Sequence, residues 1–398
     1  MPLILHNPVR SYAWGSPTVI PELLGIPPTG EPQAELWIGA HPGAPSTVDL
    51  DGVRRTLAEL IEKDPEGMLG SVTLGRFGPR LPYLLKILAV DQPLSIQAHP
   101  TTEQAEAGFE AEEAAGVPVD APNRLYRDRS HKPEMIVALT EIRALLGFRV
   151  PGEAAAVLDE LDVRELRDDA EALRGGGTAG LERVVRRWLL MPADEVASRV
   201  TAVVEAARRL DTELGHLIVK LGELYPVDRG VLIALLLQYE RLGSGEAVFV
   251  PAGVPHAYLS GVAVEPQASS DNTLRAGLTP KHVDAAELAR VLRYVPDGEL
   301  RVQPQAAGPG RAVFAPPAEE FRLERLTLGP ASMALGAGEP RIVLLTKGSA
   351  EVAAGSATVH LDRGQAVFVP ASDGATSIMG SGTAFVMSPG ADLPDTAR

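Results

Sequence analysis

The feature that most constrains the fold is a short phrase that the chain contains twice. Residues 245–256 read GEAVFVPAGVPH, and residues 364–375 read GQAVFVPASDGA. In both copies a glycine precedes the apolar run AVFV and a proline follows it, which is the pattern of a short buried strand bounded by turns. The copies then differ, because the first reaches His256 where the second has Ala375. We therefore expect two related β-rich domains, of which only the first carries a histidine at this corner.

The composition is that of a globular protein with more than one domain. The chain has 398 residues, of which 45% are hydrophobic and 22% are charged, so there is ample material for a core. This length predicts two or three domains. The formal net charge of −15 argues against nucleic acid or an anionic membrane as the main partner. An anionic small molecule stays compatible with it, because screening over about 10 Å lets a few basic groups dominate a site.

The residue types also predict the cellular compartment in which the protein is found. Cysteine is absent, which excludes disulfides and thiolate metal sites and favours a reducing cytoplasm. Residues 1–15 do not contain a basic start followed by a long apolar stretch, so we expect no signal peptide. The longest aliphatic run, at 231–237, is far shorter than the ~20 residues of a membrane helix. We expect a cytoplasmic protein without a membrane partner.

The chain divides into regions with different sequence patterns. Residues 1–150 contain short apolar runs separated by proline and glycine, which predicts buried strands joined by turns. Residues 151–225 repeat apolar residues every three or four positions, the spacing of amphipathic helices. Short apolar runs then return. We predict a mainly β fold with a discontinuous β domain of residues 1–150 and 226–305, an inserted α-helical domain of residues 151–225, and a C-terminal β domain of residues 311–398.

Two local patterns sharpen this division. Thr101 and Gln104 have capping-box spacing, and they predict a helix that ends at Gly116. Residues 175–180, GGGTAG, match the dinucleotide pattern G-x-G-x-x-G. A polar helical segment precedes them instead of the buried strand that a nucleotide site requires, so we interpret them as a loop between helices.

The stretch LSIQAHP at 94–100 places polar residues at alternate positions. Alternate side chains of a strand share one face, so Ser95, Gln97 and His99 point to the same side. This pattern predicts a strand with a functional face. The alternative is an exposed face that carries a histidine by chance.

The stretch SHKPEMIVAL at 130–139 repeats this spacing with Lys132 and Glu134. The apolar residues that follow place the strand in a core. A buried carboxylate needs a cation or hydrogen bonds to stay ionised. Lys132 alone would make a structural ion pair, whereas a metal ion is the functional alternative.

The first copy of the repeated phrase supplies another candidate ligand. Gly245, Pro251, Gly253 and His256 match the second cupin motif, G-x5-P-x-G-x2-H. Proline and glycine suit the corner that turns a histidine into the mouth of a small β-barrel. Joined with the polar strand faces, this motif predicts a metal site. Two nitrogen and two oxygen donors suit Zn²⁺ with an open position, and the candidate donors are Gln97, His99, Glu134 and His256.

Six stretches in a fixed order make a specific combination. They are SYAWGS (11–16), AELWIGAHPGAPS (34–46), LSIQAHP (94–100), HKPEM (131–135), VPHAYLSG (254–261) and SSDNTLRAGLTPKHVD (269–284). Over nearly the whole chain they resemble the type I phosphomannose isomerase family. The resemblance implies two cupin-like, jelly-roll β-barrel domains plus an α-helical domain, and a C-terminal barrel without metal ligands. It also implies one Zn²⁺ per chain on the four donors above, and a catalytic arginine at Arg275.

The resemblance further implies a reaction and a partner. The family interconverts mannose 6-phosphate and fructose 6-phosphate through a cis-enediol, so the partner is a phosphosugar. A metal with a single anionic ligand stays positive and stabilises charge that develops on oxygen. A general base must move the proton, and the sequence does not rank the candidates Lys132, His131, Glu265 and Asp271. Candidate contacts to the substrate are Arg275, Lys86, Ser95, Lys281 and Tyr258.

Other functions stay open at this level. Two histidines and a carboxylate also suit Fe(II), as in a cupin oxygenase, although an amide ligand and the basic groups around Arg275 fit a phosphosugar better. The second alternative is a sensor that binds a sugar phosphate without catalysing a reaction. The presence of Lys132 argues against it. We interpret His41, Trp14 and Trp37 as packing residues, and we expect a monomer.

Overall fold

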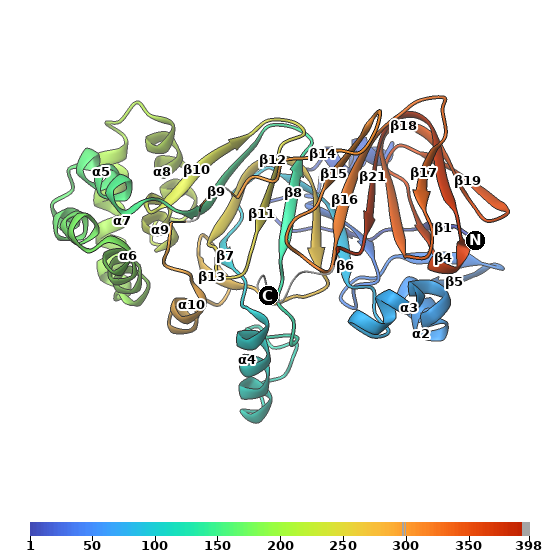
Figure 1. Ribbon diagram of the computed structural model, residues 1–398. Helices are drawn as coiled ribbons and strands as arrows, with labels where there is room; N and C mark the ends of the chain where they lie inside the picture. The colour runs from blue at the N-terminus through green and yellow to red at the C-terminus, as the bar shows by residue number, and fades with distance from the viewer. Residues whose placement is uncertain (297, 299, 392–398) are drawn as a thin grey trace.

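The protein is mainly β, with one group of helices at one end of the molecule and further helices below the sheets in this view (Figure 1). The computed structural model describes residues 1–296, 298 and 300–391. The predicted mainly β fold with a helical insertion is confirmed. In the described part of the chain the strands form two large antiparallel sheets, which stand side by side, and a small hairpin of β4 (Thr47–Leu50) and β5 (Val53–Thr56).

The first sheet contains ten of the described strands. They are β2 (Val9–Arg10), β3 (Glu35–Gly39), β6 (Tyr83–Val90), β7 (Ile96–Ala98), β8 (Glu134–Ala138), β9 (Ile142–Phe148), β10 (Leu237–Leu242), β11 (Ala247–Val250), β12 (His256–Ala268) and β13 (Leu274–Gly277). The long strand β12 connects them, because it pairs with β6, β7, β8 and β9. Its first residue, His256, lies opposite Gln97, and Gln267 near its end lies opposite Glu134. One strand thus brings together segments that are far apart in sequence.

The second sheet contains nine of the described strands. They are β1 (Leu3–Leu5), β14 (Gln305–Ala306), β15 (Arg311–Phe314), β16 (Arg322–Leu328), β17 (Met333–Gly336), β18 (Arg341–Ala354), β19 (Ala357–Asp362), β20 (Ala366–Val369) and β21 (Thr376–Ser388). Strand β1 pairs with β20, so the start of the chain belongs to this sheet. The sequence did not predict that β1 belongs to the second sheet. The division at residues 1–150, 151–225, 226–305 and 311–398 stays a prediction.

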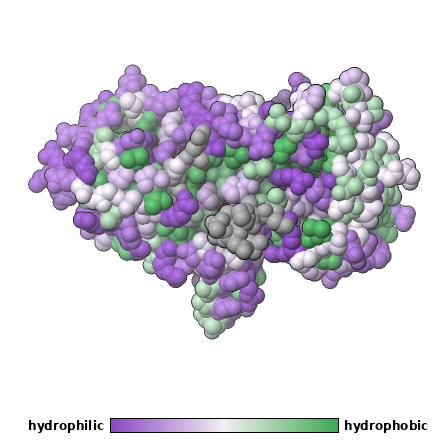
Figure 2. All heavy atoms as spheres, in the orientation of Figure 1, coloured by the Kyte–Doolittle hydropathy of each residue, from purple (hydrophilic) through white to green (hydrophobic). Residues whose placement is uncertain are grey.

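The helices flank these sheets. Their bounds are α1 (Val19–Leu24), α2 (Leu57–Lys63), α3 (Pro65–Phe77), α4 (Thr102–Ala114), α5 (Pro151–Leu161), η1 (Arg164–Leu166), α6 (Arg167–Leu190), α7 (Ala193–Ala207), α8 (Glu213–Leu224), α9 (Gly230–Leu235), α10 (Ala285–Val291) and η2 (Ala371–Asp373). Helices α5 to α9 form the end of the molecule farthest from the second sheet (Figure 1). Hydrophilic residues predominate over this helical end, whereas the second sheet presents more residues of intermediate hydropathy (Figure 2).

The two local sequence patterns have different outcomes. Helix α4 begins after Thr101, whose side chain accepts from the backbone of Gln104 in a complete capping box, as predicted. Residues 175–180 do not form an open loop. They lie inside α6 at a sharp kink, where Gly177 has φ of 54°, a left-handed conformation that glycine adopts without a Cβ clash. Among the described helices, none is both long and apolar enough to cross a bilayer.

Candidate metal centre and anion-binding cavity

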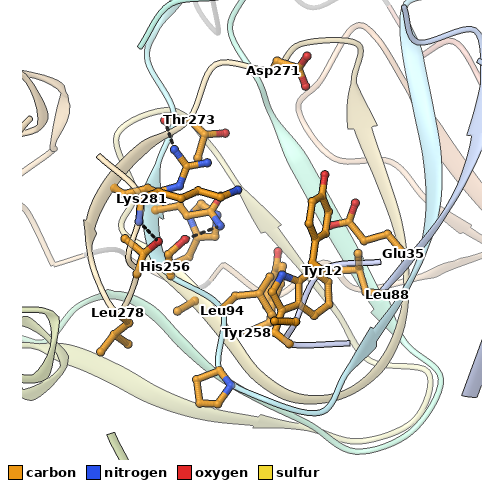
Figure 3. Close-up of a pocket in the computed structure, with 18 of the residues that line it drawn as sticks. Tyr12, Glu35, Leu88, Leu94, His256, Tyr258, Asp271, Thr273, Leu278 and Lys281 are labelled. Carbon is orange, nitrogen blue, oxygen red and sulfur yellow. Dashed lines mark hydrogen bonds between the residues drawn. The ribbon is translucent and has the colours of Figure 1, made fainter. Parts of the chain in front are cut away.

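A cavity of ≈ 810 Å³ opens on the first sheet. Its walls come from β3, β6, β7, β12 and β13 and from the loops beside them. In Figure 3, Thr273, Lys281 and His256 lie on one side of the cavity, and Tyr12 and Glu35 face them from the other. The cavity is lined by both acidic and basic side chains, so its chemistry depends on which of them neutralise one another.

Three predicted ligands converge beside this cavity: Glu134 and His256 line it, and the fully buried His99 contacts Glu134. The Nε2 atom of His99 lies 3.2 Å from Oε2 of Glu134, and Nε2 of His256 lies 3.0 Å from Oε1 of the same carboxylate. All three side chains are buried. Within the described residues, these ligand atoms form the one group that could hold a metal ion, with every pair within 4.8 Å.

Backbone carbonyls orient both histidine rings. His99 uses Nδ1 to contact the carbonyl of Asn272 at 2.7 Å, and His256 uses Nδ1 to contact the carbonyl of Val254 at 3.0 Å. A hydrogen bond from Nδ1–H to a carbonyl leaves Nε2 with a free lone pair, which is the arrangement of a metal-ligating histidine. Burial, reinforced by the charge of Lys132, lowers the pKa of His99 to about 4, so the ring is neutral and able to bind a metal at physiological pH.

Glu134 is held in its charged form. Burial by itself raises the pKa of a carboxyl, but Lys132 and the two histidines outweigh it and hold the pKa of Glu134 well below its usual range. The Nζ atom of Lys132 lies 2.9 Å from Oε2 of Glu134, and the hydroxyl of Tyr258 donates to Oε1 at 3.2 Å. Tyr258 is thus hydrogen-bonded to the carboxylate and also lines the cavity, and its contact with the substrate stays a prediction.

The fourth predicted ligand, Gln97, lies beside this group. It is the strand neighbour of His256 and also of Arg275. Its Nε2 atom donates to Oγ of Ser95 at 3.1 Å, which leaves the amide oxygen as its free donor atom. Ser95, which we expected to contact the substrate, therefore fixes the orientation of Gln97. The donor set of two imidazoles, a carboxylate and an amide oxygen fits Zn²⁺.

Asn272 connects the site to the loop that precedes β8, and sequence reasoning missed it. Its Nδ2 donates to the carbonyls of Asp128 at 2.7 Å and Ser130 at 2.9 Å. Its Oδ1 accepts from the backbone of Arg127 at 2.7 Å. Because its own carbonyl orients His99, Asn272 ties a metal ligand to residues 127–130. The sequence signal was its place in the family stretch DNTLRAG, where only the arginine had been given a role.

Three cations gather on one side of the cavity without a counter-charge. Arg275, Lys281 and Arg127 all line it, and none of them forms an ion pair with any residue that the structure describes. Burial and the neighbouring charge of Arg127 lower the pKa of Arg275, and burial with both arginines lowers the pKa of Lys281. Such mutual repulsion is relieved by a bound anion. Arg127 was missed, although it stands in the basic run RLYRDR just before HKPE.

Lys86 is paired with carboxylates and is not available to an anion in the same way. Its Nζ atom lies 3.1 Å from Oε2 of Glu265 and 3.8 Å from Oε2 of Glu35. Burial opposes the charge of the amine, but Glu35, Glu265 and Glu134 outweigh it and raise the pKa of Lys86. Burial also raises the pKa of Glu265 to about 7, although Lys86 acts in the opposite direction. Lys86 is thus ion-paired with carboxylates while it lines the cavity, and its contact with the substrate stays a prediction.

The remaining candidates lie apart from the metal group. Asp271 lines the cavity and faces Nε2 of His41 at 3.6 Å, while Nδ1 of His41 accepts from the backbone of Gly43. His41 is thus a polar neighbour of Asp271, not only a packing residue. The Nε2 atom of His131 lies 2.6 Å from Glu320, and His131 does not line the described cavity, so its role as a base stays a prediction that this geometry does not support.

Together, the curled antiparallel sheet, the buried donor set and the uncompensated cations define a metal-binding β protein with a site for an anionic ligand. Residues 3–151 match the family model of the phosphomannose isomerase type I catalytic domain. The mannose-6-phosphate isomerase of Escherichia coli K12 is 37% identical over 385 residues, covering 95% of this chain and 97% of that protein. The Bos taurus mannose-6-phosphate isomerase is 31% identical over 402 residues, with 92% of each chain covered.

A solved structure is similar over the same extent. It is the mannose 6-phosphate isomerase of Salmonella typhimurium bound to its substrate, fructose 6-phosphate, and to zinc. It matches with a TM-score of 0.91 and 35% identity, and the match covers 98% of this chain and 100% of that one. The chain belongs to the type I phosphomannose isomerase family, which confirms the resemblance seen in the sequence.

Proposed function

We propose that this chain interconverts mannose 6-phosphate and fructose 6-phosphate as a zinc-dependent aldose–ketose isomerase. One observation carries the proposal: Glu134 and His256, which form the donor group together with the buried His99, line the same cavity as the uncompensated cations Arg275 and Lys281. A metal at one place and a phosphate at another would fix both ends of a sugar phosphate. The similar proteins are mannose-6-phosphate isomerases, which supports the assignment.

We assign the metal to Gln97, His99, Glu134 and His256. When bound there, Zn²⁺ supplies a Lewis acid that stabilises negative charge on the sugar oxygens. The chain's own contribution is to direct Nε2 of both imidazoles to the metal through the Nδ1 contacts and to leave only one anionic ligand. One carboxylate among four donors keeps the occupied site positive, which suits an oxyanion that forms next to it.

We assign the phosphate to Arg275, Lys281 and Arg127. A phosphate dianion accepts several charge-assisted hydrogen bonds, and arginine offers two parallel donors to it. The guanidinium of Arg275 is oriented by a long contact of Nη1 to the carbonyl of Thr273 at 3.5 Å. Lys281 lies over the ring of Tyr12, with Nζ 5.4 Å from its centroid. Holding the phosphate here fixes the distance and direction in which the sugar carbons extend toward the metal donors.

We assign the proton transfer between C1 and C2 to Glu265. Its carboxyl is buried in the cavity wall, and a pKa raised to about 7 suits a group that must both take up and release a proton near neutral pH. Lys86, at 3.1 Å, keeps it oriented. Lys132 contributes charge beside Glu134. Asp271 is the second candidate for proton transfer, because it also lines the cavity.

We further propose that the first sheet forms a cupin-like jelly-roll domain, that residues 151–225 form the inserted helical domain, and that residues 311–398 form a second cupin-like domain without a metal. The repeated AVFV strands, β11 and β20, support this division, because both are fully buried and both precede a strand of 13 residues. The cytoplasmic location and the monomeric state stay predictions.

The test is turnover of fructose 6-phosphate by the purified protein, with mannose 6-phosphate and glucose 6-phosphate separated as products. We expect mannose 6-phosphate, loss of activity with a chelator and recovery with Zn²⁺. No turnover by protein shown to contain zinc would contradict the isomerase and favour a silent sugar-phosphate binder. Turnover after verified metal removal would keep the reaction and overturn the metal assignment.

A further inference from the structure

A side-chain bond connects the second sheet's unit to the segment that carries Glu134. His131 is three residues before Glu134, and its Nε2 lies 2.6 Å from Oε1 of Glu320. Glu320 stands in the connection between β15 and β16, and its side chain is only 14% exposed. The two residues are 189 positions apart, so the bond joins separate parts of the fold.

The segment from Ser130 to Glu134 enters the site without regular secondary structure until β8 begins. Its backbone is fastened at two places on the cavity side: the carbonyl of Ser130 accepts from Asn272 at 2.9 Å, and the carbonyl of Pro133 accepts from Ala268 at 3.0 Å. His131 lies between these places, and its side chain contacts Glu320. Lys132, the next residue, is the one whose amine contacts Glu134 and His99.

The contact with Glu320 has an energetic cost, because it keeps a carboxylate group buried. The second carboxylate oxygen of Glu320 is buried without a hydrogen-bond partner among the residues that the structure describes. A buried, half-satisfied carboxylate is unfavourable unless its charge is compensated. His131 supplies that compensation. Removing either residue therefore leaves the other buried without its charged partner.

We infer that Glu320 is a positioning residue for the active site: through His131 it holds residues 130–134 so that Lys132 and Glu134 keep their places beside the metal donors. The second domain thereby completes the site of the first without contributing a ligand. The kinetic part of this inference rests on the proposed isomerase activity, whereas its structural part does not.

The charges around the bond favour the ion pair. Burial lowers the pKa of His131, but Glu320 outweighs it, Glu103 and Glu319 act in the same direction, and the result is a raised pKa. Burial raises the pKa of Glu320, but His131 and Arg80 lower it below its usual range. A histidine with a raised folded-state pKa contributes stability that is complete below its ordinary value of 6.5 and is lost as the pH rises through the raised value.

The experiment compares Glu320→Ala and Glu320→Gln with a matched control, Tyr83→Phe. The hydroxyl of buried Tyr83 donates to the carbonyl of Pro340 at 2.9 Å, so the control removes another bond between the two units without touching residues 130–134. We expect kcat of the Glu320→Ala enzyme to fall about 10-fold, the lower range for loss of an outer-shell contact at a metal site. KM stays nearly constant, because the cations Arg275 and Lys281 are not affected.

Two further measurements do not depend on turnover. Amide hydrogen exchange of residues 128–135 is expected to accelerate in Glu320→Ala but not in Tyr83→Phe, and zinc affinity is expected to fall about 10-fold in the former alone. Glu320→Gln keeps an acceptor without the charge, so its defect is smaller. The advantage of the wild type over Glu320→Gln is largest below the raised pKa of His131 and disappears above it.

Equal effects of Glu320→Ala and Tyr83→Phe on kcat, exchange and zinc affinity would overturn the inference and leave a merely structural contact. If Glu320→Ala does not fold, the same comparison with Glu320→Gln decides. If the wild type shows no isomerase activity, the proposed function fails, and the exchange and zinc measurements still decide the positioning role.

Discussion

The two copies of the AVFV strand show how one scaffold supports two different outcomes. Strands β11 and β20 are both fully buried, and each is followed by a strand of 13 residues. After β11, Gly253 turns the chain with φ of 79° and delivers His256 buried at the start of β12. After β20, the helical turn η2 replaces this corner, and Ala375 is exposed. The strand is preserved while the corner that presents a ligand is lost.

The interiors differ as much as the corners. The first sheet keeps buried charged residues, among them Lys86, Lys132, Glu134 and Glu265, around its cavity. The second sheet packs an apolar cluster with members such as Val343, Leu345 and Val367. Its buried charged residues Glu324 and Arg341 are paired with Arg311 and Glu339. Metal binding therefore requires donors from several strands at once, whereas the fold requires only the apolar strand pattern. This difference is why a copy can lose its chemistry without losing its structure.

The largest expected effect comes from giving the first copy the residue of the second. His256→Ala removes a metal ligand, and activity should fall by more than the ~10–100-fold that loss of an outer-shell contact costs. The reciprocal change, Ala375→His, should bind no zinc, because its corner is exposed and the described residues form no group of metal-ligating side chains there. Metal content per chain and turnover measure both. Zinc bound by the Ala375→His protein in addition to the first site would show that a corner histidine suffices.

A smaller effect is expected from the proton-transfer group. Glu265→Gln keeps the shape of the side chain but cannot take up a proton, so kcat should fall about 10²–10⁴-fold. Because the carboxylate is the active form, kcat/KM of the wild type should fall as the pH drops through an inflection at or below about 7. Asp271→Asn is the matched comparison. A larger loss in Asp271→Asn, with the inflection unchanged in Glu265→Gln, would transfer the role to Asp271.

The cation cluster should show a more moderate effect on binding. A hydrogen bond to a charged group contributes about 1.5–3 kcal/mol, so Arg127→Ala and Arg275→Ala should each lower kcat/KM about 10–100-fold, with Arg127→Ala acting mainly through KM. Arg363→Ala removes an exposed cation between β19 and β20 and serves as the control for net charge. An unchanged KM for Arg127→Ala would remove this residue from the phosphate site.

The smallest effect on activity is expected from the second copy. Phe368 of β20 is completely buried, and Phe249 of β11 is nearly so. Replacing either by alanine should cost about 3–5 kcal/mol of stability, measured by denaturant unfolding. Only Phe249→Ala should also weaken zinc binding, because its strand pairs Val250 with Glu134. Weakened zinc binding in Phe368→Ala beyond its loss of stability would mean that the two copies are more closely coupled than their separate cores indicate.

The sequence was informative wherever the alternation of a strand determines the face to which a side chain points. Strand alternation placed Ser95 and Gln97 on the cavity side and Lys132 beside Glu134, and the corner motif placed His256 with them. It failed where the direction is set by tertiary contacts. Nothing in the local pattern of His131 reveals Glu320, because the bond depends on how two distant segments meet. The same holds for β1, whose three residues join a sheet formed by the other end of the chain.

The phosphate side could be predicted only in part. Arg275 and Lys281 lie in a stretch typical of the family, whereas Arg127 lies in a loop and reaches the cavity because Asn272 holds its backbone. Lys86 was predicted to meet the phosphate, since a lysine among apolar residues needs a polar partner. The partner in the structure is the pair of carboxylates Glu35 and Glu265, one from a strand on each side of β6.

The central claim is that the first copy alone carries a catalytic metal, and its most direct test is a titration of the metal-free protein with Zn²⁺ while fructose 6-phosphate turnover is measured. The account predicts that activity rises linearly and reaches its plateau at one equivalent of zinc per chain, with no response in His256→Ala. Full activity before zinc is added, or a plateau that requires two equivalents, would contradict it.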